Sequence, residues 1–150
     1  MSRERIIIDT NLLMLLLVGM YDPSYIARHK RTNDYSAEDF EMLVMRLERC
    51  EIVFVSNVLT EVSNLLWLTP NPYCDHLRAL LKELIHQKDE HHVPAKVAVA
   101  VEEFSLLGLT DASLINSAPN GTILTVDLDL YLAAQIKGLP SENFNHLRFN

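Results

Sequence analysis

The chain has 150 residues, of which 49% are hydrophobic and 22% are charged, and its formal net charge is −7. This length suits one domain with a substantial core and is too short for two, and the composition excludes a disordered chain. The acidic balance argues against nucleic-acid binding through broad basic coverage, because phosphate binding depends on Lys and Arg. It is compatible with an acidic site that holds metal cations. We expect a single globular domain over residues 1–150.

The two cysteines, Cys50 and Cys74, have no nearby thiol or suitably spaced His. This excludes a disulfide scaffold and a zinc quartet, so we expect two reduced thiols. The apolar run near the N-terminus is interrupted by Asp9 and Asn11, and what remains is too short to span a bilayer. We therefore predict a cytoplasmic protein without a membrane partner.

The first 50 residues begin with a strand that runs directly into a helix. Arg5 to Ile8 is a short β-branched run, and the apolar residues 11–20 are long enough for a buried helix. Residues 20–35 are polar and broken, which predicts a loop with at most one helical turn. Residues 36–50 predict a second helix, with Ser36 as its N-cap and apolar residues recurring on one face.

The middle of the chain continues this alternation. Residues 51–56, EIVFVS, have a second buried-strand pattern, and residues 57–68 have helical spacing. Residues 73–87 predict another amphipathic helix. The adjacent histidines at 91–92 are expected to end a helix, and residues 94–107 are predicted to form one helix.

The last third contains the remaining elements. Residues 110–118 predict a short helix with Thr110 as its N-cap, and residues 122–126, TILTV, predict a third strand. A helix over residues 127–138 is closed by a glycine, and residues 146–149, HLRF, are expected to form a last strand. Strands without polar alternation that alternate with helices are buried on both faces. The sequence therefore predicts an α/β fold, a three-layer α/β/α sandwich with a mainly parallel central sheet.

Four acidic residues follow predicted strands or begin predicted helices, which is where open parallel sheets bind ligands. Each aspartate alone is readily explained as a helix cap, but Glu61 is flanked by apolar residues and needs a partner or a metal. If the acids converge, they cannot all stay ionised without a cation. Carboxylate ligands suit Mg²⁺ or Mn²⁺, which assist phosphodiester hydrolysis. The four are Asp9, Glu61, Asp111 and Asp127.

The sequences IIIDTNLL, LTEV, LTDASLI and ILTVDLDL occur in this order with helical sequence between them, and together they resemble the four motifs of PIN-domain nucleases. The resemblance runs from about Arg5 to Leu139. It implies a single PIN-like domain, one or two Mg²⁺ or Mn²⁺ ions, and cleavage of RNA that leaves a 5′-phosphate. Many small members of the family are toxins, so the resemblance also implies an antitoxin partner and a homodimer.

The resemblance assigns roles to particular residues. At the fourth motif two acids are available, and residues two apart point in different directions, so we expect Asp127 rather than Asp129 to be the direct ligand. The acids that match catalytic and metal-binding positions are Asp9, Glu61, Asp111 and Asp127, and the residues that match supporting positions are Asn11, Thr125 and Asp129.

The densest basic cluster is the sequence ARHKR at residues 27–31. Its side chains Arg28, Lys30 and Arg31 are candidates for contacts with an RNA backbone. A solvated loop with ordinary surface charge is the open alternative.

Other functions are less compatible with these residues. A haloacid-dehalogenase-like phosphatase needs a second Asp where this chain has Asn11, and a response-regulator receiver needs an acidic pair before its first helix. No glycine-rich phosphate loop is present. The remaining alternative is a PIN-like protein without catalysis, acting as a binding or scaffold subunit.

Overall fold

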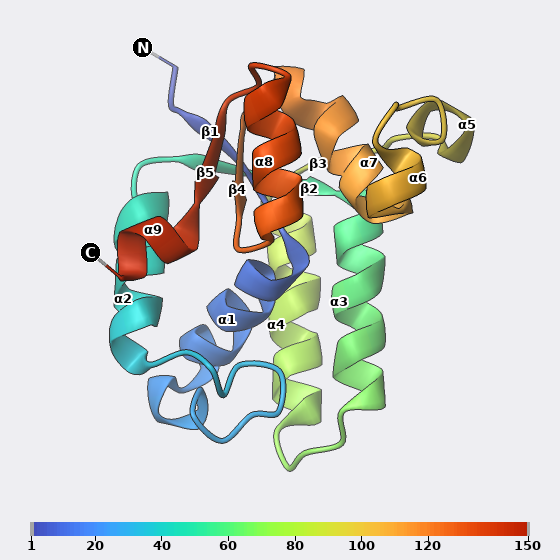
Figure 1. Ribbon diagram of the computed structural model, residues 1–150. Helices are drawn as coiled ribbons and strands as arrows, with labels where there is room; N and C mark the ends of the chain where they lie inside the picture. Colours follow the sequence, from blue (N-terminus) through green and yellow to red (C-terminus); the bar gives the residue numbers. More distant parts are fainter. Residues whose placement is uncertain (1, 150) are drawn as a thin grey trace.

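The computed structural model describes residues 2–149. At its centre lies a five-stranded sheet in the order β3-β2-β1-β4-β5, in which every neighbouring pair is parallel (Figure 1). The predicted α/β sandwich with a parallel sheet is therefore confirmed. The strands are β1 (Arg5–Ile8), β2 (Glu51–Val55), β3 (Asp89–His91), β4 (Thr122–Thr125) and β5 (Ser141–Asn143).

The three central strands are those that the sequence predicted. In β1, Ile6, Ile7 and Ile8 are fully buried, and the last four residues of β2 are buried as well. Burial on both faces explains the absence of polar alternation, because neither face of the sheet meets water.

Helices flank the sheet on both faces. Connections between parallel strands are right-handed, which places α1 to α4 on one face and α7 and α8 on the other. Helices α1, α3 and α4 pack against one another (Figure 1). The helices are α1 (Thr10–Tyr21), α2 (Ala37–Leu47), α3 (Ser56–Leu68), α4 (Cys74–Gln87), α5 (Ala95–Ala98), α6 (Phe104–Leu107), α7 (Leu109–Ser117), α8 (Leu128–Ile136) and α9 (Phe144–Arg148), with short 3₁₀ turns η1 (Pro23–Tyr25) and η2 (Ala118–Asn120).

The start of α2 follows its prediction. Ser36 Oγ accepts a hydrogen bond from the backbone N–H of Asp39 at 3.1 Å, and Asp39 Oδ2 accepts one from the backbone N–H of Ser36 at 2.9 Å. This reciprocal capping box satisfies two backbone donors that the helix leaves free. The segment before it is the predicted loop with one helical turn, η1.

Both edge strands were missed by sequence reasoning. The adjacent histidines do not end a helix: α4 ends at Gln87, and His91 closes the edge strand β3. Charged residues in the sequence DEH conceal this strand, although charge on an edge strand is common because it discourages pairing with other chains. The predicted strand HLRF is also wrong. Those residues belong to α9 and its end, and β5 precedes them.

The prediction of one helix over residues 94–107 is wrong. The chain forms two one-turn helices, α5 and α6, separated by residues 99–103. Three valines stand between Lys96 and Glu102, and β-branched residues weaken helix formation. Thr110 is not the N-cap of α7 either, because the helix begins at Leu109 after Gly108, whose φ of +89° favours glycine.

Within residues 2–149, no helix is both long enough and apolar enough to cross a membrane.

Candidate active site

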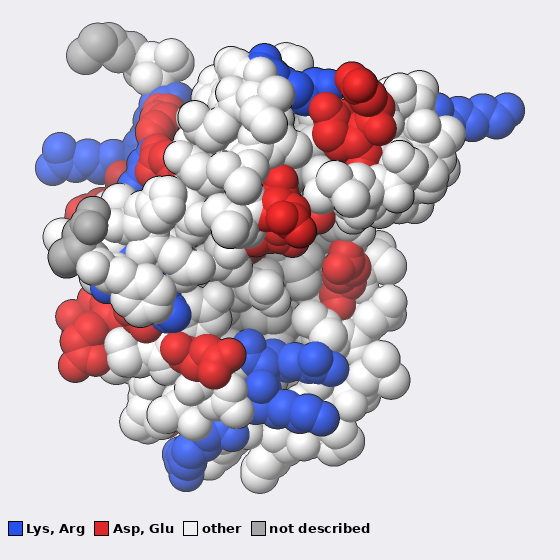
Figure 2. Space-filling model, viewed as in Figure 1, with Lys and Arg blue, Asp and Glu red and all other residues white. Residues whose placement is uncertain are grey.

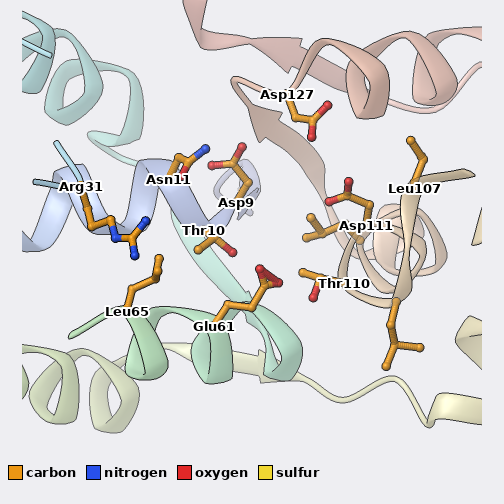
Figure 3. A pocket seen from close by; sticks show the side chains of 12 residues that line it. Asp9, Thr10, Asn11, Arg31, Glu61, Leu65, Leu107, Thr110, Asp111 and Asp127 are labelled. Carbon is orange, nitrogen blue, oxygen red and sulfur yellow. The ribbon is translucent and has the colours of Figure 1, made fainter. Parts of the chain in front are cut away.

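The four predicted acids come together at the carboxyl ends of the central strands. Asp9 directly follows β1, Glu61 lies in the second turn of α3 after β2, and Asp127 follows β4. Asp111 comes from the first turn of α7. Since β2 and β4 pair with opposite sides of β1, this is the point where the strand order reverses and open α/β sheets bind ligands. Figure 3 shows all four carboxylates around one space.

That space is a pocket of about 430 Å³, within the range of roughly 300–1,000 Å³ typical of ligand sites. Its walls are acidic and hydroxylic near the strand ends and apolar on the sides of α3 and α7. Asn11, an exposed residue of the first turn of α1, also lines it. The lining residues are Asp9, Thr10, Asn11, Arg31, Glu61, Leu65, Leu107, Leu109, Thr110, Asp111, Leu114 and Asp127.

Asp9 is the most firmly held of the acids. Its side chain is 6% exposed, and Oδ1 accepts a hydrogen bond from the backbone N–H of Leu12 at 2.9 Å. Oδ2 accepts bonds from Thr125 Oγ1 at 2.5 Å and from the backbone N–H of Val126 at 3.0 Å. Burial raises the pKa of Asp9, although these three hydrogen bonds oppose the shift. Asp9 is thus the N-cap of α1, a role that Thr10 and Asn11 do not fill, and it fixes a carboxylate at the edge of the pocket.

Thr125 connects two of the acids. Its hydroxyl donates to Asp9 and accepts a hydrogen bond at 2.9 Å from the backbone N–H of Asp127. The side chains of Thr125 and Asp9 are both buried, so this hydroxyl–carboxylate contact is shielded from water. The supporting residue suggested by the sequence therefore sits between β1 and the start of α8.

Replacing Thr125 with valine is expected to lower the free energy of unfolding by about 2 kcal/mol, because the isosteric side chain removes one of the two hydrogen bonds to the buried Oδ2 of Asp9 and the hydrogen bond to the Asp127 N–H. Urea denaturation at pH 7 measures this change. Thr122→Val on the same strand is the matched control, since Thr122 makes no side-chain hydrogen bond among the described residues. Equal stability of the two variants would contradict the assigned role of Thr125.

The two acids at the start of α8 differ in position. Asp127 lines the pocket and caps α8, with Oδ1 accepting from the backbone N–H of Leu130 at 3.1 Å. Asp129 is exposed in the first turn and does not line the pocket. Asp127 therefore lines the pocket with the other acids, whereas Asp129 lies outside its wall but near enough for its charge to raise the pKa of Asp111.

Glu61 and Asp111 have no compensating partners. Among the described residues, neither carboxylate accepts a hydrogen bond or lies within 4.0 Å of a basic group. Burial raises the pKa of Asp111 to about 7, and the charges of Asp127, Asp9 and Glu61 add to the shift. The pocket therefore concentrates negative charge, and Arg31, a basic residue of its wall, forms an ion pair with none of the four acids.

No three His, Cys, Asp or Glu side chains within residues 2–149 are grouped closely enough to form a ready metal site. The fit to a divalent cation lies instead in the donors, because four carboxylates face one pocket. Burial and the neighbouring acids raise the pKa of Asp111, and a cation would oppose both effects by favouring the ionised carboxylate. Oxygen donors of this kind suit Mg²⁺ or Mn²⁺.

No family model matches this sequence, and no curated protein matches it. Among solved structures, the chain is similar to a domain of a functionally unknown protein from Methanocaldococcus jannaschii DSM 2661. The two share 15% sequence identity over 93% of this chain and 90% of that chain, with a TM-score of 0.49.

The predicted basic contacts divide into two groups. Arg28 and Lys30 are exposed, and the Arg28 guanidinium lies 5.4 Å from the centre of the Tyr25 ring. Arg31 alone reaches the pocket wall, where Nε donates to Thr69 Oγ1 at 3.3 Å. Figure 2 shows basic side chains directly below the acidic centre of this face, in the region where the segment between α1 and α2 runs.

Sequence reasoning missed the backbone and apolar parts of the site. The Val126 N–H that holds Asp9 carries no sequence signal, because every residue except proline has such a donor. Leu65 and Leu107 form part of the wall, and their leucine identity does not distinguish them from core residues. Thr69, which holds Arg31, directly follows the helix predicted over residues 57–68 and has no sequence signal that marks it as a functional residue.

Proposed function

We propose that this protein is a metal-dependent endoribonuclease of the PIN type, which hydrolyses phosphodiester bonds of RNA at the acidic pocket. The observation that supports the proposal most strongly is that Asp9, Glu61, Asp111 and Asp127, far apart in sequence, line one pocket, where none of them forms an ion pair with a basic residue among residues 2–149. If the four acids were only independent helix caps, nothing would require them to line the same pocket. Burial and mutual repulsion also carry a stability cost, which a functional cation site explains.

The residues that would hold Mg²⁺ or Mn²⁺ are these four acids. When bound, one or two such ions would lower the pKa of a coordinated water and neutralise negative charge on the phosphoryl group. Thr125 and the Val126 N–H keep the Asp9 carboxylate in a fixed position, which limits the reorganisation needed when the substrate arrives.

Asp111 exchanges a proton near neutral pH, since its pKa is raised to about 7. A proton and a cation therefore compete for the same pocket. Activity is expected to rise with pH through this range, as the carboxyl group loses its proton more readily.

Arg31 is suited to bind a phosphate of the substrate. It lines the pocket, Thr69 orients its guanidinium through Nε, and among the described residues it forms no ion pair with any acid. A planar guanidinium with free N–H groups binds phosphate oxygens in pairs. We infer that it lies along the path of the RNA strand, with Arg28 and Lys30 further out.

Arg31→Ala is expected to raise the KM for a short single-stranded RNA about tenfold, because one charge-assisted phosphate contact is worth roughly 1.5–3 kcal/mol and water replaces part of it. The value of kcat should change little. Steady-state cleavage of a labelled oligonucleotide gives both constants. Arg3→Ala, at an exposed arginine outside the pocket, is the control. A fall in kcat with unchanged KM would contradict this role.

The test of the proposed function is cleavage of a fluorescent single-stranded RNA with Mn²⁺, comparing the wild-type protein with Asp9→Asn purified in parallel. Metal-dependent cleavage by the wild type that is lost in the variant supports the proposal. Equal activity in both would remove Asp9 from the mechanism and indicate contamination. No cleavage, together with no thermal stabilisation by Mn²⁺, would favour the binding or scaffold function.

The role as a toxin, the antitoxin partner, the homodimer and the cytoplasmic location stay predictions, which come from the resemblance and the composition.

A further inference from the structure

A second hollow adjoins the acidic pocket. It has a volume of about 320 Å³ and shares two wall residues, Glu61 and Thr110, with the acidic pocket. It lies between the start of α3, the chain after β3 and the start of α7. A ligand bound over the four acids could therefore extend directly into this second hollow. The lining residues are Ser56, Asn57, Thr60, Glu61, His92, Val93, Ala95 and Thr110.

The chemistry of this hollow differs from that of the acidic pocket. Glu61, at the shared boundary, is its only carboxylate, and no Lys or Arg lines it. The apolar part of the wall is the exposed Ala95 backed by the buried Val93, and the other groups are hydroxyls, an amide and an imidazole. Without a cationic residue the hollow does not suit a phosphate. An apolar surface with polar groups around it suits the neutral, flat part of a nucleotide.

Two of the polar side chains are free to bind a ligand. Ser56 Oγ is engaged with Glu90 Oε2 at 2.5 Å, and Thr60 Oγ1 donates to the backbone carbonyl of Ser56 at 3.2 Å. In the part of the chain that the structure describes, the side chains of Asn57 and His92 form no hydrogen bond. Asn57 offers one donor group and one acceptor on the same amide, and His92 adds a ring of the kind on which bases stack.

We propose that this hollow binds a nucleobase of single-stranded RNA, next to the phosphodiester that lies over the four acids, and that the Asn57 amide hydrogen-bonds the edge of that base. The inference rests on the proposed nuclease function. An amide is matched by a base edge that places a donor and an acceptor side by side, which each of the four bases offers, so the contact distinguishes a base from an abasic position. In a duplex the Watson–Crick edge is already paired, so the hollow favours unpaired RNA.

The experiment measures binding without cleavage. The Asp9→Asn protein is titrated into 5′-fluorescein hexamers of adenylate, of cytidylate and of abasic ribose phosphate, and affinity is read by fluorescence anisotropy. We expect the adenylate or cytidylate hexamer to bind about tenfold more tightly than the abasic one, the size of one good base contact. Adding Asn57→Ala should reduce this preference to what stacking on His92 alone supplies, and it should leave binding of the abasic hexamer unchanged.

Asn64→Ala is the matched control, because Asn64 is an exposed asparagine on the same helix and lines neither cavity. It should retain the full preference. A shift of the Asn57 side-chain amide signal in ¹⁵N-correlated NMR spectra on addition of the preferred hexamer tests the contact without a variant. RNA binding that leaves this signal unmoved would overturn the proposal.

Failure of the subsite and failure of the nuclease function give different results. Equal affinity for the base-containing and abasic hexamers, with metal-dependent cleavage by the wild type, would overturn the subsite alone. A base preference that depends on Asn57, in a protein that cleaves no RNA, would support the subsite and overturn the nuclease function.

Discussion

Glu61→Gln is expected to reduce RNA cleavage with Mn²⁺ by more than about a hundredfold, since loss of an outer residue that merely orients a metal ligand already costs 10–100-fold. Glutamine keeps the size of the side chain and removes its charge. Glu61 is half-buried and forms no hydrogen bond or ion pair among the described residues, so the fold should tolerate the change. The loss of activity would then report on the charge at the pocket.

The measurement is the initial rate of cleavage at saturating RNA, followed by a titration of Mn²⁺. A weakened metal site should shift the Mn²⁺ dependence to higher concentration. Glu102→Gln is the matched control, because Glu102 is exposed and lies outside the pocket. A Glu61→Gln protein as active as this control would show that Glu61 is a surface acid without a role in catalysis.

Asp111→Asn is expected to abolish cleavage and yet make the metal-free protein more stable at pH 8, by about 2 kcal/mol. Because the pKa of Asp111 is raised to about 7, the ionised carboxyl destabilises the folded state. A tenfold change in an ionisation constant corresponds to about 1.4 kcal/mol, and the expected gain is smaller than the raised pKa alone implies because solvent reaches part of the side chain. The neutral amide removes the cost of burying a charge and the repulsion from Asp127 and Asp9.

The effect has a definite pH window. Between the ordinary carboxyl pKa of 3.8 and about 7, the folded protein keeps the proton of Asp111 while the unfolded chain releases it. The contribution of Asp111 to the free energy of unfolding of the metal-free wild type should therefore fall as the pH rises from about 4 to 7. Asp111→Asn removes this contribution, so the two proteins should be similar near pH 4 and differ most above pH 7.

Urea denaturation in EDTA from pH 4 to pH 8 measures both curves. Repeating it with Mn²⁺ at a hundred times its dissociation constant should stabilise the wild type by about 2.7 kcal/mol and the variant much less. A variant that is less stable than the wild type at pH 8 without metal would contradict the account of a repulsive acidic pocket.

The sheet was largely predictable because its central strands have a distinct composition. Runs such as RIII and TILTV are β-branched and uninterrupted, which few environments other than a doubly covered strand produce. The edge strands β3 and β5 have three residues each, and their polar sequences DEH and SEN resemble loops. Their pairing is decided by tertiary position, which local sequence does not record.

The acids of the site were predictable because each follows a recognisable strand or begins a recognisable helix. The double role of Asp9 was less evident, since capping alone explains an aspartate at the start of a helix, whereas this residue both caps α1 and lines the pocket. The position of Arg31 depends on the path of the loop between α1 and α2 and on its contact with Thr69. Long-range contacts of this kind have no periodic pattern in the sequence.

Titration calorimetry of Mn²⁺ into the metal-free protein tests the central claim most directly, because the claim is that four carboxylates share one cation site. The wild type is expected to bind one or two Mn²⁺ ions and to release protons near pH 7, and Asp111→Asn is expected to bind them much more weakly. No binding by the wild type, or equal binding by the two proteins, would contradict a shared metal site at Asp9, Glu61, Asp111 and Asp127.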